Sequence, residues 1–122
     1  MNREIKVRFW DGFDYMSNPY TLHEILFNKS IQFTKDCIQL QFTGLKDKNG
    51  VDIFEGDVVN VFGIKSVIEF HLGSFCYIAT TADLRTHYPI CGSNITIDNN
   101  QCNEVEVIGN IYETPELLNP QP

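Results

Sequence analysis

The fold of this chain is decided by residues 43–59, which read TGLKDKNGVDIFEGDVV. This stretch holds two turn signals a few residues apart, and each leads into β-branched or aromatic residues. Asn49-Gly50 is a strong hairpin signal because both residues accept a positive φ at little steric cost. Glu55-Gly56-Asp57 makes the second turn. Two reversals this close leave no room for a helix, so we expect tightly folded β structure with Gly50 and Gly56 in conformations that other residues would strain.

Strand-like patterns continue on both sides of this stretch. The residues before it, 38–43, read IQLQFT and alternate apolar with polar, which predicts a half-buried antiparallel strand. Apolar runs then recur between Gly, Asn and Asp turns along the rest of the chain. We predict strands over 58–62, 67–70, 75–78, 95–97 and 105–112. The strands at 67–70 and 75–78 form a hairpin, and the weak signals of 80–94 favour a loop with a helical turn over 82–85.

The start of the chain predicts another strand. Residues 5–10 read IKVRFW and alternate apolar with charged residues, so Ile5, Val7 and Phe9 should point inward. A turn at Asp11-Gly12 then leads into a return strand at 15–16.

Two short helices are expected outside the main run of strands. Thr21 and Glu24 imitate a capping box, which favours a helix of two turns over 21–27. A short strand at 31–33 follows it. Pro115 opens a final helical turn over 115–118, because proline suits the first position of a helix.

Short strands separated by tight turns describe one all-β domain over residues 1–122. The close spacing of the turns favours a small, partly open, SH3-like barrel over a sandwich, which usually needs more strands. We place the barrel at 37–114, an N-terminal hairpin and short helix at 1–36, and a C-terminal turn and frayed tail at 115–122.

The charge of the chain argues against several classes of partner. The formal net charge is −7, from sixteen Asp and Glu against nine Lys and Arg. Nucleic-acid binding usually needs a basic patch, so it is disfavoured. Arg3, Lys6 and Arg8 do cluster on the first strand, where we expect a solvated face. The longest apolar run is far shorter than the roughly 20 residues that cross a bilayer, and the start lacks the apolar block of a signal peptide. We therefore expect a cytoplasmic protein with no membrane partner.

The four cysteines predict neither a zinc site nor a disulfide framework. Zinc sites usually place two ligands on one tight turn, whereas Cys91 and Cys102, the closest pair, are far apart and have no histidine beside them. Disulfides need an oxidising compartment. We expect Cys37 and Cys76 to act as small hydrophobic residues within strands.

Three blocks carry a resemblance to a known family. Residues 3–11, 41–59 and 106–118 read REIKVRFWD, QFTGLKDKNGVDIFEGDVV and EVIGNIYETPELL, and they resemble the opening, central and closing motifs of YopX-family proteins. The resemblance implies an SH3-like barrel and a phage or prophage accessory protein in the cytoplasm of a bacterial host. It carries over no catalytic, cofactor-binding or metal-binding residues.

Most residues of the matching blocks have structural explanations. Turns, bulges or close approaches account for four glycines: Gly44, Gly50, Gly56 and Gly109. Side-chain to main-chain hydrogen bonds in turns account for Asp47, Asn49 and Asp57. The alternative is that Asp47, Asp52, Glu55 and Asp57 hold a divalent cation, although their spacing does not match an EF-hand loop. The histidines, His23, His71 and His87, lie in unrelated contexts and are expected at the surface or at strand edges.

These observations leave two function classes open. The first is a non-enzymatic binding module that pairs with a host or phage protein and, because small barrels must cover the edges of strands such as 105–112, with copies of itself. A variant of it binds nucleic acid, which would require Arg3, Lys6, Arg8, Lys46, Lys48 and Lys65 to share one side. The second is a metal-dependent hydrolase built on residues 47–57. We favour the binding module, with no cofactor and no assigned site residues.

Overall fold

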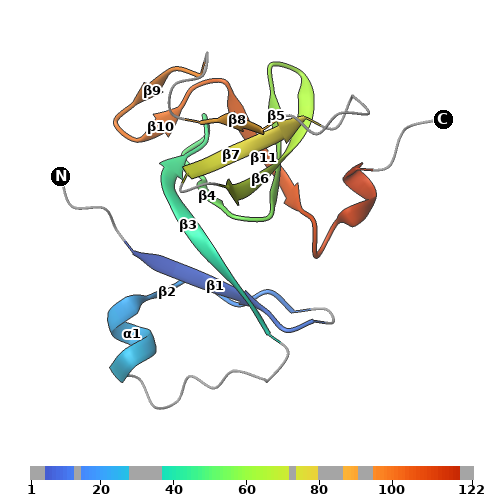
Figure 1. The fold of residues 1–122 in the computed structure, drawn as a ribbon. Coiled ribbons are helices and arrows are strands. Elements are labelled where there is room, and N and C mark those ends of the chain that lie inside the picture. The colour runs from blue at the N-terminus through green and yellow to red at the C-terminus, as the bar shows by residue number, and fades with distance from the viewer. Residues whose placement is uncertain are drawn as a thin grey trace.

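A computed structural model describes residues 5–12, 15–27, 37–71, 74–79, 87–90 and 95–118 of the chain. They form two β-sheets, one short helix and one 3₁₀ turn (Figure 1). The first sheet contains β2 (Tyr20–Thr21), β1 (Lys6–Trp10), β3 (Ile38–Lys46), β10 (Gln101–Cys102) and β9 (Ile97–Asp98), in that order, and β4 (Asp52–Phe54) also pairs with β3. The second contains β11 (Val105–Asn110), β5 (Asp57–Val61), β6 (Ile64–His71), β7 (Ser74–Ala79) and β8 (His87–Pro89). All of these neighbours are antiparallel except β3 and β10.

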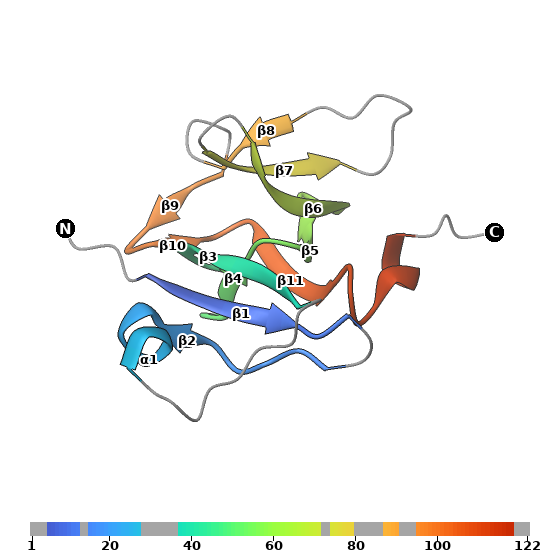
Figure 2. The same cartoon turned by 60° about the horizontal axis from the view of Figure 1, so that its bottom comes forward.

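The prediction of an all-β fold is confirmed. The described strands form two sheets and no closed barrel, so the SH3-like likeness stays a prediction for the region 37–114. Figure 2 shows β1 and β2 at one end of the molecule with the helix α1 (Leu22–Phe27), and β7 and β8 at the other.

The main core joins strands of both sheets. Ile53 of β4 and Cys102 of β10 come from the first sheet, and Val59, Ile68 and Val105 come from the second. All five are at most 2% exposed. Burial on this scale supplies most of the stability that a small domain has.

The N-terminal segment is an integral part of the first sheet. β1 pairs with β3 over four residues, from Val7 opposite Gln41 to Trp10 opposite Ile38. The predicted inward positions of Val7 and Phe9 are confirmed, but the prediction for Ile5 is wrong, because Ile5 precedes β1 and is exposed. The return strand is reduced to one bridge, between Trp10 and Met16.

The capping box of the helix is confirmed. The Glu24 N–H donates to Thr21 Oγ1 at 3.2 Å, and the Thr21 N–H donates to Glu24 Oε1 at 3.1 Å. These bonds satisfy main-chain donors that the first turn of a helix leaves without partners. The helix spans Leu22–Phe27, so it ends at the predicted residue.

Three other expectations change in detail. Pro89 lies in β8, at the edge of the second sheet, where a residue without an N–H is tolerated, so the prediction of loop there is wrong. β11 ends at Asn110 because Asn110 Oδ1 accepts the N–H groups of Tyr112 and Glu113, which turns the chain. The strand expected at 95–97 begins only at Ile97.

The helical turn predicted at 115–118 is confirmed as the 3₁₀ helix Pro115–Leu118. The predictions for 31–33, 82–85 and 119–122 fall outside the described residues.

Gly50 and Gly56, the two turn glycines of residues 43–59, have the predicted backbone. The φ angle is +82° at Gly50 and +86° at Gly56. The Gly50 N–H donates to the Asp47 carbonyl at 3.0 Å, and the Asp47 N–H donates to the Val51 carbonyl at 2.8 Å, which closes the loop between β3 and β4. Gly109 is a close-approach position as well as a bulge, since an added methyl group would collide with the side chains of Thr114 and Leu117.

We predict that Gly50→Val lowers the free energy of unfolding by about 1–2 kcal/mol, because a β-branched residue resists positive φ. Nothing lies within 4 Å of an added Cβ at Gly50, so the cost comes from the backbone alone. Gly50→Asn is the matched control and should cost clearly less, since asparagine tolerates this region. Urea unfolding measures both, and equal losses for the two variants would contradict the prediction.

Candidate functional site

The acidic residues of 47–57 are the first candidates for a site, and the structure gives each of them its own partners. Asp47 is completely buried. Its Oδ1 accepts the N–H groups of Asn49 and Val51, both at 2.9 Å, which holds the turn as predicted. Its Oδ2 accepts the N–H of Val107 on β11, also at 2.9 Å. Asp47 therefore ties the β3–β4 turn to the second sheet.

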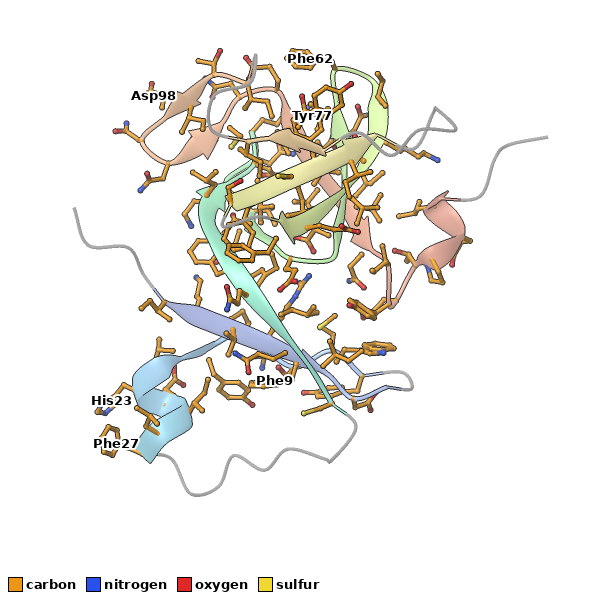
Figure 3. The ribbon with its side chains drawn as sticks, in the orientation of Figure 1. Phe9, His23, Phe27, Phe62, Tyr77 and Asp98 are labelled. Carbon is orange, nitrogen blue, oxygen red and sulfur yellow. The ribbon has the colours of Figure 1, made fainter. Side chains whose placement is uncertain are left out.

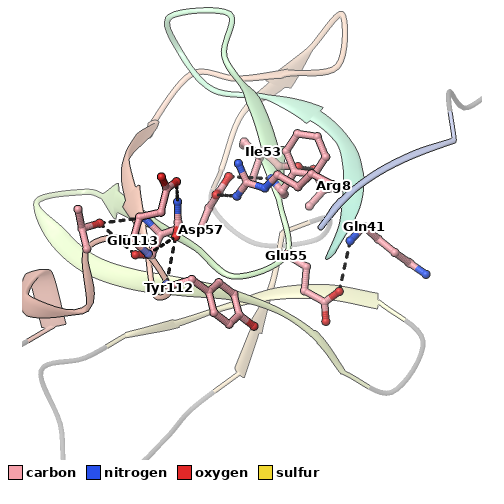
Figure 4. A network of polar contacts seen from close by, with 11 residues as sticks. Arg8, Gln41, Ile53, Glu55, Asp57, Tyr112 and Glu113 are labelled. Carbon is pink, nitrogen blue, oxygen red and sulfur yellow. Dashed lines mark hydrogen bonds and ion pairs between the residues drawn. The ribbon is translucent and has the colours of Figure 1, made fainter. Parts of the chain in front are cut away.

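Asp57 makes a second tie, between β5 and β1 (Figure 4). This buried side chain accepts the Phe54 N–H at 2.7 Å through Oδ2, and it pairs with Arg8 Nη2 through Oδ1. The Arg8 guanidinium carbon lies 4.5 Å from the centre of the Phe54 ring. A carboxylate and an aromatic face thus hold one arginine between the sheets.

Lys6 repeats this arrangement two residues earlier on β1. Its Nζ pairs with Asp52 and lies 4.5 Å from the centre of the Phe42 ring, and Lys46 pairs with the same carboxylate at 2.9 Å. The predicted solvated face is therefore wrong for Lys6 and Arg8, whose side chains are each 15% exposed. The β3–β4 hairpin covers that face of the strand with Phe42 and Phe54. Arg3 lies outside the described residues.

The remaining acidic residue of this hairpin also has its own partner. Glu55, the fourth acidic residue, accepts the Gln41 N–H at 3.4 Å. In the described parts of the chain, no three His, Cys, Asp or Glu side chains lie together in a way that could hold a metal ion. Cys76 and Cys102 are buried, Cys37 is half-buried, and Cys91 is outside the described residues, so the absence of zinc and disulfides stays a prediction.

The environments of the two ion-paired aspartates shift their pKa values in opposite directions. Burial raises the pKa of Asp52, but hydrogen bonds and charges from Lys6 and Lys46 outweigh burial and hold it below the ordinary value. Burial raises the pKa of Asp57 to about 6, against the lowering effects of Arg8 and the Phe54 N–H.

We predict that Asp57 titrates near pH 6 in the folded protein, compared with 3.8 for an ordinary aspartate. Because the folded pKa is the higher one, the folded state binds more protons between these two values. The contribution of Asp57 to the free energy of unfolding should therefore rise as pH falls from about 7 to about 4. NMR titration of the carboxyl carbons measures the midpoint, and Asp57→Asn is the control that lacks this pH dependence. A midpoint at the ordinary value would contradict the prediction.

A different feature stands out at the β5–β6 hairpin. Val61 pairs with Ile64, so the turn contains only Phe62 and Gly63, with φ angles of +53° and +84°. A bulky residue with positive φ is an outlier. Phe62 is 57% exposed, and Figure 3 shows its side chain at the end of the molecule opposite α1. The sequence pattern predicts Phe62 as the end of a strand; the only signal for the turn is Gly63 between two β-branched runs.

The Phe62 ring borders an open groove of about 340 Å³, which we call the Phe62 groove. Its lining consists of Lys48, Asn60, Phe62, Gly63, Asn103, Glu104 and Glu106. Glu104 Oε2 accepts the Thr96 N–H at 2.8 Å, and hydrogen bonding to Thr96 holds the pKa of Glu104 below its usual value. Glu106 Oε2 lies 3.3 Å from Lys48 Nζ. The groove therefore combines an aromatic ring with carboxylates whose positions the fold sets.

Comparison with known proteins places the chain in a family. No curated protein matches it. A crystal structure of protein EF1440 from Enterococcus faecalis is similar, with 27% sequence identity, a TM-score of 0.55, and coverage of 93% of this chain and 97% of that one. The model of the family described as YopX protein matches residues 3–119, almost the whole sequence. The chain belongs to the YopX protein family.

Proposed function

We propose that this protein is a non-enzymatic binding module that holds a partner protein in the Phe62 groove. One observation carries the proposal. Phe62 is a large apolar residue in a backbone conformation that costs on the order of 1–2 kcal/mol, and it is nevertheless more than half exposed. Residues held in such conformations cluster at functional sites.

A second two-residue turn of this chain, between β9 and β10, has the same backbone conformation with residues that suit it. The residues between β9 and β10 are Asn99 and Asn100, with φ angles of +52° and +62°. Asparagine reaches this region readily. Phe62 occupies an equivalent position with the wrong residue type for the turn, which supports a role outside the fold.

Affinity capture from a bacterial host, with and without phage infection, tests the proposal. Phe62→Asn should lose the partner and keep or gain stability, because asparagine suits positive φ. The matched control is Tyr15→Asn, which removes a ring exposed to a similar extent (59%) elsewhere and should keep the partner. Equal capture by wild type and Phe62→Asn would overturn the assignment of the groove.

We also propose that the protein is encoded by a phage or prophage and acts in the cytoplasm of the bacterial host. The resemblance of the three motif blocks supports this context. None of the helices in the described residues is long and apolar enough to cross a membrane. Capture of the partner only from infected cells would support the context, and capture from phage-free cells would point to a host partner.

The nucleic-acid alternative has little support. Lys6, Arg8, Lys46 and Lys48 all form ion pairs with carboxylates of this chain. The net charge of −7 also repels phosphates. These four residues would have to leave their partners before they could contact a nucleic-acid backbone.

Self-association remains a proposal, but through another surface than expected. The outer edge of β11 is covered by the β3–β4 turn, because the Val105 carbonyl accepts the Lys48 N–H and the Val107 N–H donates to Asp47. The better candidate is α1, whose Leu26 and Phe27 side chains are largely exposed. Light scattering of wild type should give more than one copy, and Leu26→Ser should give a monomer. A monomeric wild type at high concentration would remove the proposal.

A further inference from the structure

We propose that the Phe62 groove recognises an arginine side chain of the partner protein. This inference rests on the proposed function and adds the chemistry of the partner. It starts from the residues that line the groove, which include one exposed aromatic residue, Phe62, two glutamates and two asparagines.

A guanidinium group fits this combination better than other side chains do. Its flat face stacks on an aromatic ring, and its five N–H donors match carboxylate and amide oxygens. Glu104 is prepared for such a contact because the Thr96 N–H holds its Oε2. Holding one oxygen fixes the carboxylate plane before the ligand arrives, which lowers the entropy lost on binding.

Lys48 acts as a resident cation that an incoming arginine replaces. Its Nζ lies 3.3 Å from Glu106 Oε2, and both side chains are more than two-fifths exposed. Exposed ion pairs of this kind contribute little free energy, so displacing the lysine costs little. Its main chain is held independently, since the Lys48 N–H donates to Val105 and the Lys48 carbonyl accepts Gln101 Nε2. The lysine side chain can therefore be changed without disturbing the turn.

The overall charge favours the same partner. A net charge of −7 attracts cationic segments over distances of about a Debye length and repels acidic ones. Binding should accordingly weaken as salt concentration rises.

NMR titration of the full chain with two peptides tests the inference. The probe is a blocked glycine-serine hexapeptide with two arginines, and its control is the same peptide with citrulline, which keeps the shape and removes the charge. The arginine peptide should shift the amide signals of Phe62, Gly63, Asn103 and Glu104, and the citrulline peptide should not. Shifts of equal size with both peptides, or shifts spread over the whole surface, would overturn the inference.

Three variants make the test more specific, because we expect them to weaken, strengthen and leave unchanged the affinity for the arginine peptide. Glu104→Gln should weaken arginine-peptide binding about tenfold, the loss of one charge-assisted contact. Lys48→Met should strengthen it about threefold by releasing Glu106. Glu116→Gln, which removes an exposed carboxylate on the 3₁₀ helix, should change nothing. Weaker binding by Lys48→Met, or equal losses in the two glutamate variants, would contradict the arrangement.

The failure of this inference is distinguishable from failure of the proposed function. If partner capture depends on Phe62 while the arginine peptide fails to bind, the groove binds a partner of other chemistry. If neither depends on Phe62, both proposals fall.

Discussion

Replacing Asp47 with alanine is expected to lower the free energy of unfolding by roughly 4–6 kcal/mol, because three N–H groups lose a charged acceptor at once. Two of these groups belong to the turn, Asn49 and Val51, and the third belongs to Val107 in the other sheet. The carboxylate is completely buried, so water cannot take its place without opening the structure. A loss of this size is a large part of the stability of an ordinary domain, about 5–15 kcal/mol.

Urea unfolding followed by circular dichroism measures this effect. Asp98→Ala is the matched control, an exposed aspartate on β9 whose replacement should change stability by no more than about 0.5 kcal/mol. Asp47→Asn should fall between the two, because one amide oxygen can still accept while the NH₂ group faces donors. If Asp47→Ala and Asp98→Ala unfold at the same urea concentration, the tie between the sheets contributes nothing.

The second large effect is expected at Asp57. Asp57→Ala should cost about 3–5 kcal/mol, since it leaves Arg8 Nη2 and the buried Phe54 N–H without their acceptors. Arg8 tolerates the loss of an acceptor poorly, because its Nε is already buried without a hydrogen-bond partner.

A double-mutant cycle separates this cause from general damage. Combining Asp57→Ala with Arg8→Met should recover part of the loss, because methionine fills the space against Phe54 without needing an acceptor. The single and double variants are compared by urea unfolding at one pH above the Asp57 pKa. Additive losses would show that the ion pair is not the origin of the effect.

Local features of the fold could be predicted from the sequence. The capping box of Thr21 and Glu24 and the positive φ of Gly50 and Gly56 follow from steric and hydrogen-bonding preferences within a few residues. The turn-holding role of Asp47 is predictable in the same way, because the N–H groups that its carboxylate accepts lie at most four residues further along the chain.

The long-range contacts could not be predicted in this way. Alternation along β1 indicates that Lys6 and Arg8 share a face, but not that the β3–β4 hairpin covers it with aromatic rings. The exposed Phe62 was missed for a related reason, since the β-branched run before it continues the strand pattern and only the pairing of Val61 with Ile64 reveals a two-residue turn. Such facts depend on register between strands, which no short stretch of sequence contains.

The contacts of Asp57 with Arg8 and of Asp47 with Val107 also limit when the fold can form during synthesis. Arg8 meets a partner 49 positions later, and Asp47 meets Val107 60 positions later. Contacts of this range slow folding, because the entropy of closing a long loop is lost before they form. During synthesis, the turn at Asp47 emerges early and keeps an unfilled acceptor until the strand containing Val107 is made. A ribosome that stops before residue 107 therefore releases a chain that carries the other described strands and lacks the contact that closes its first tight turn against the second sheet.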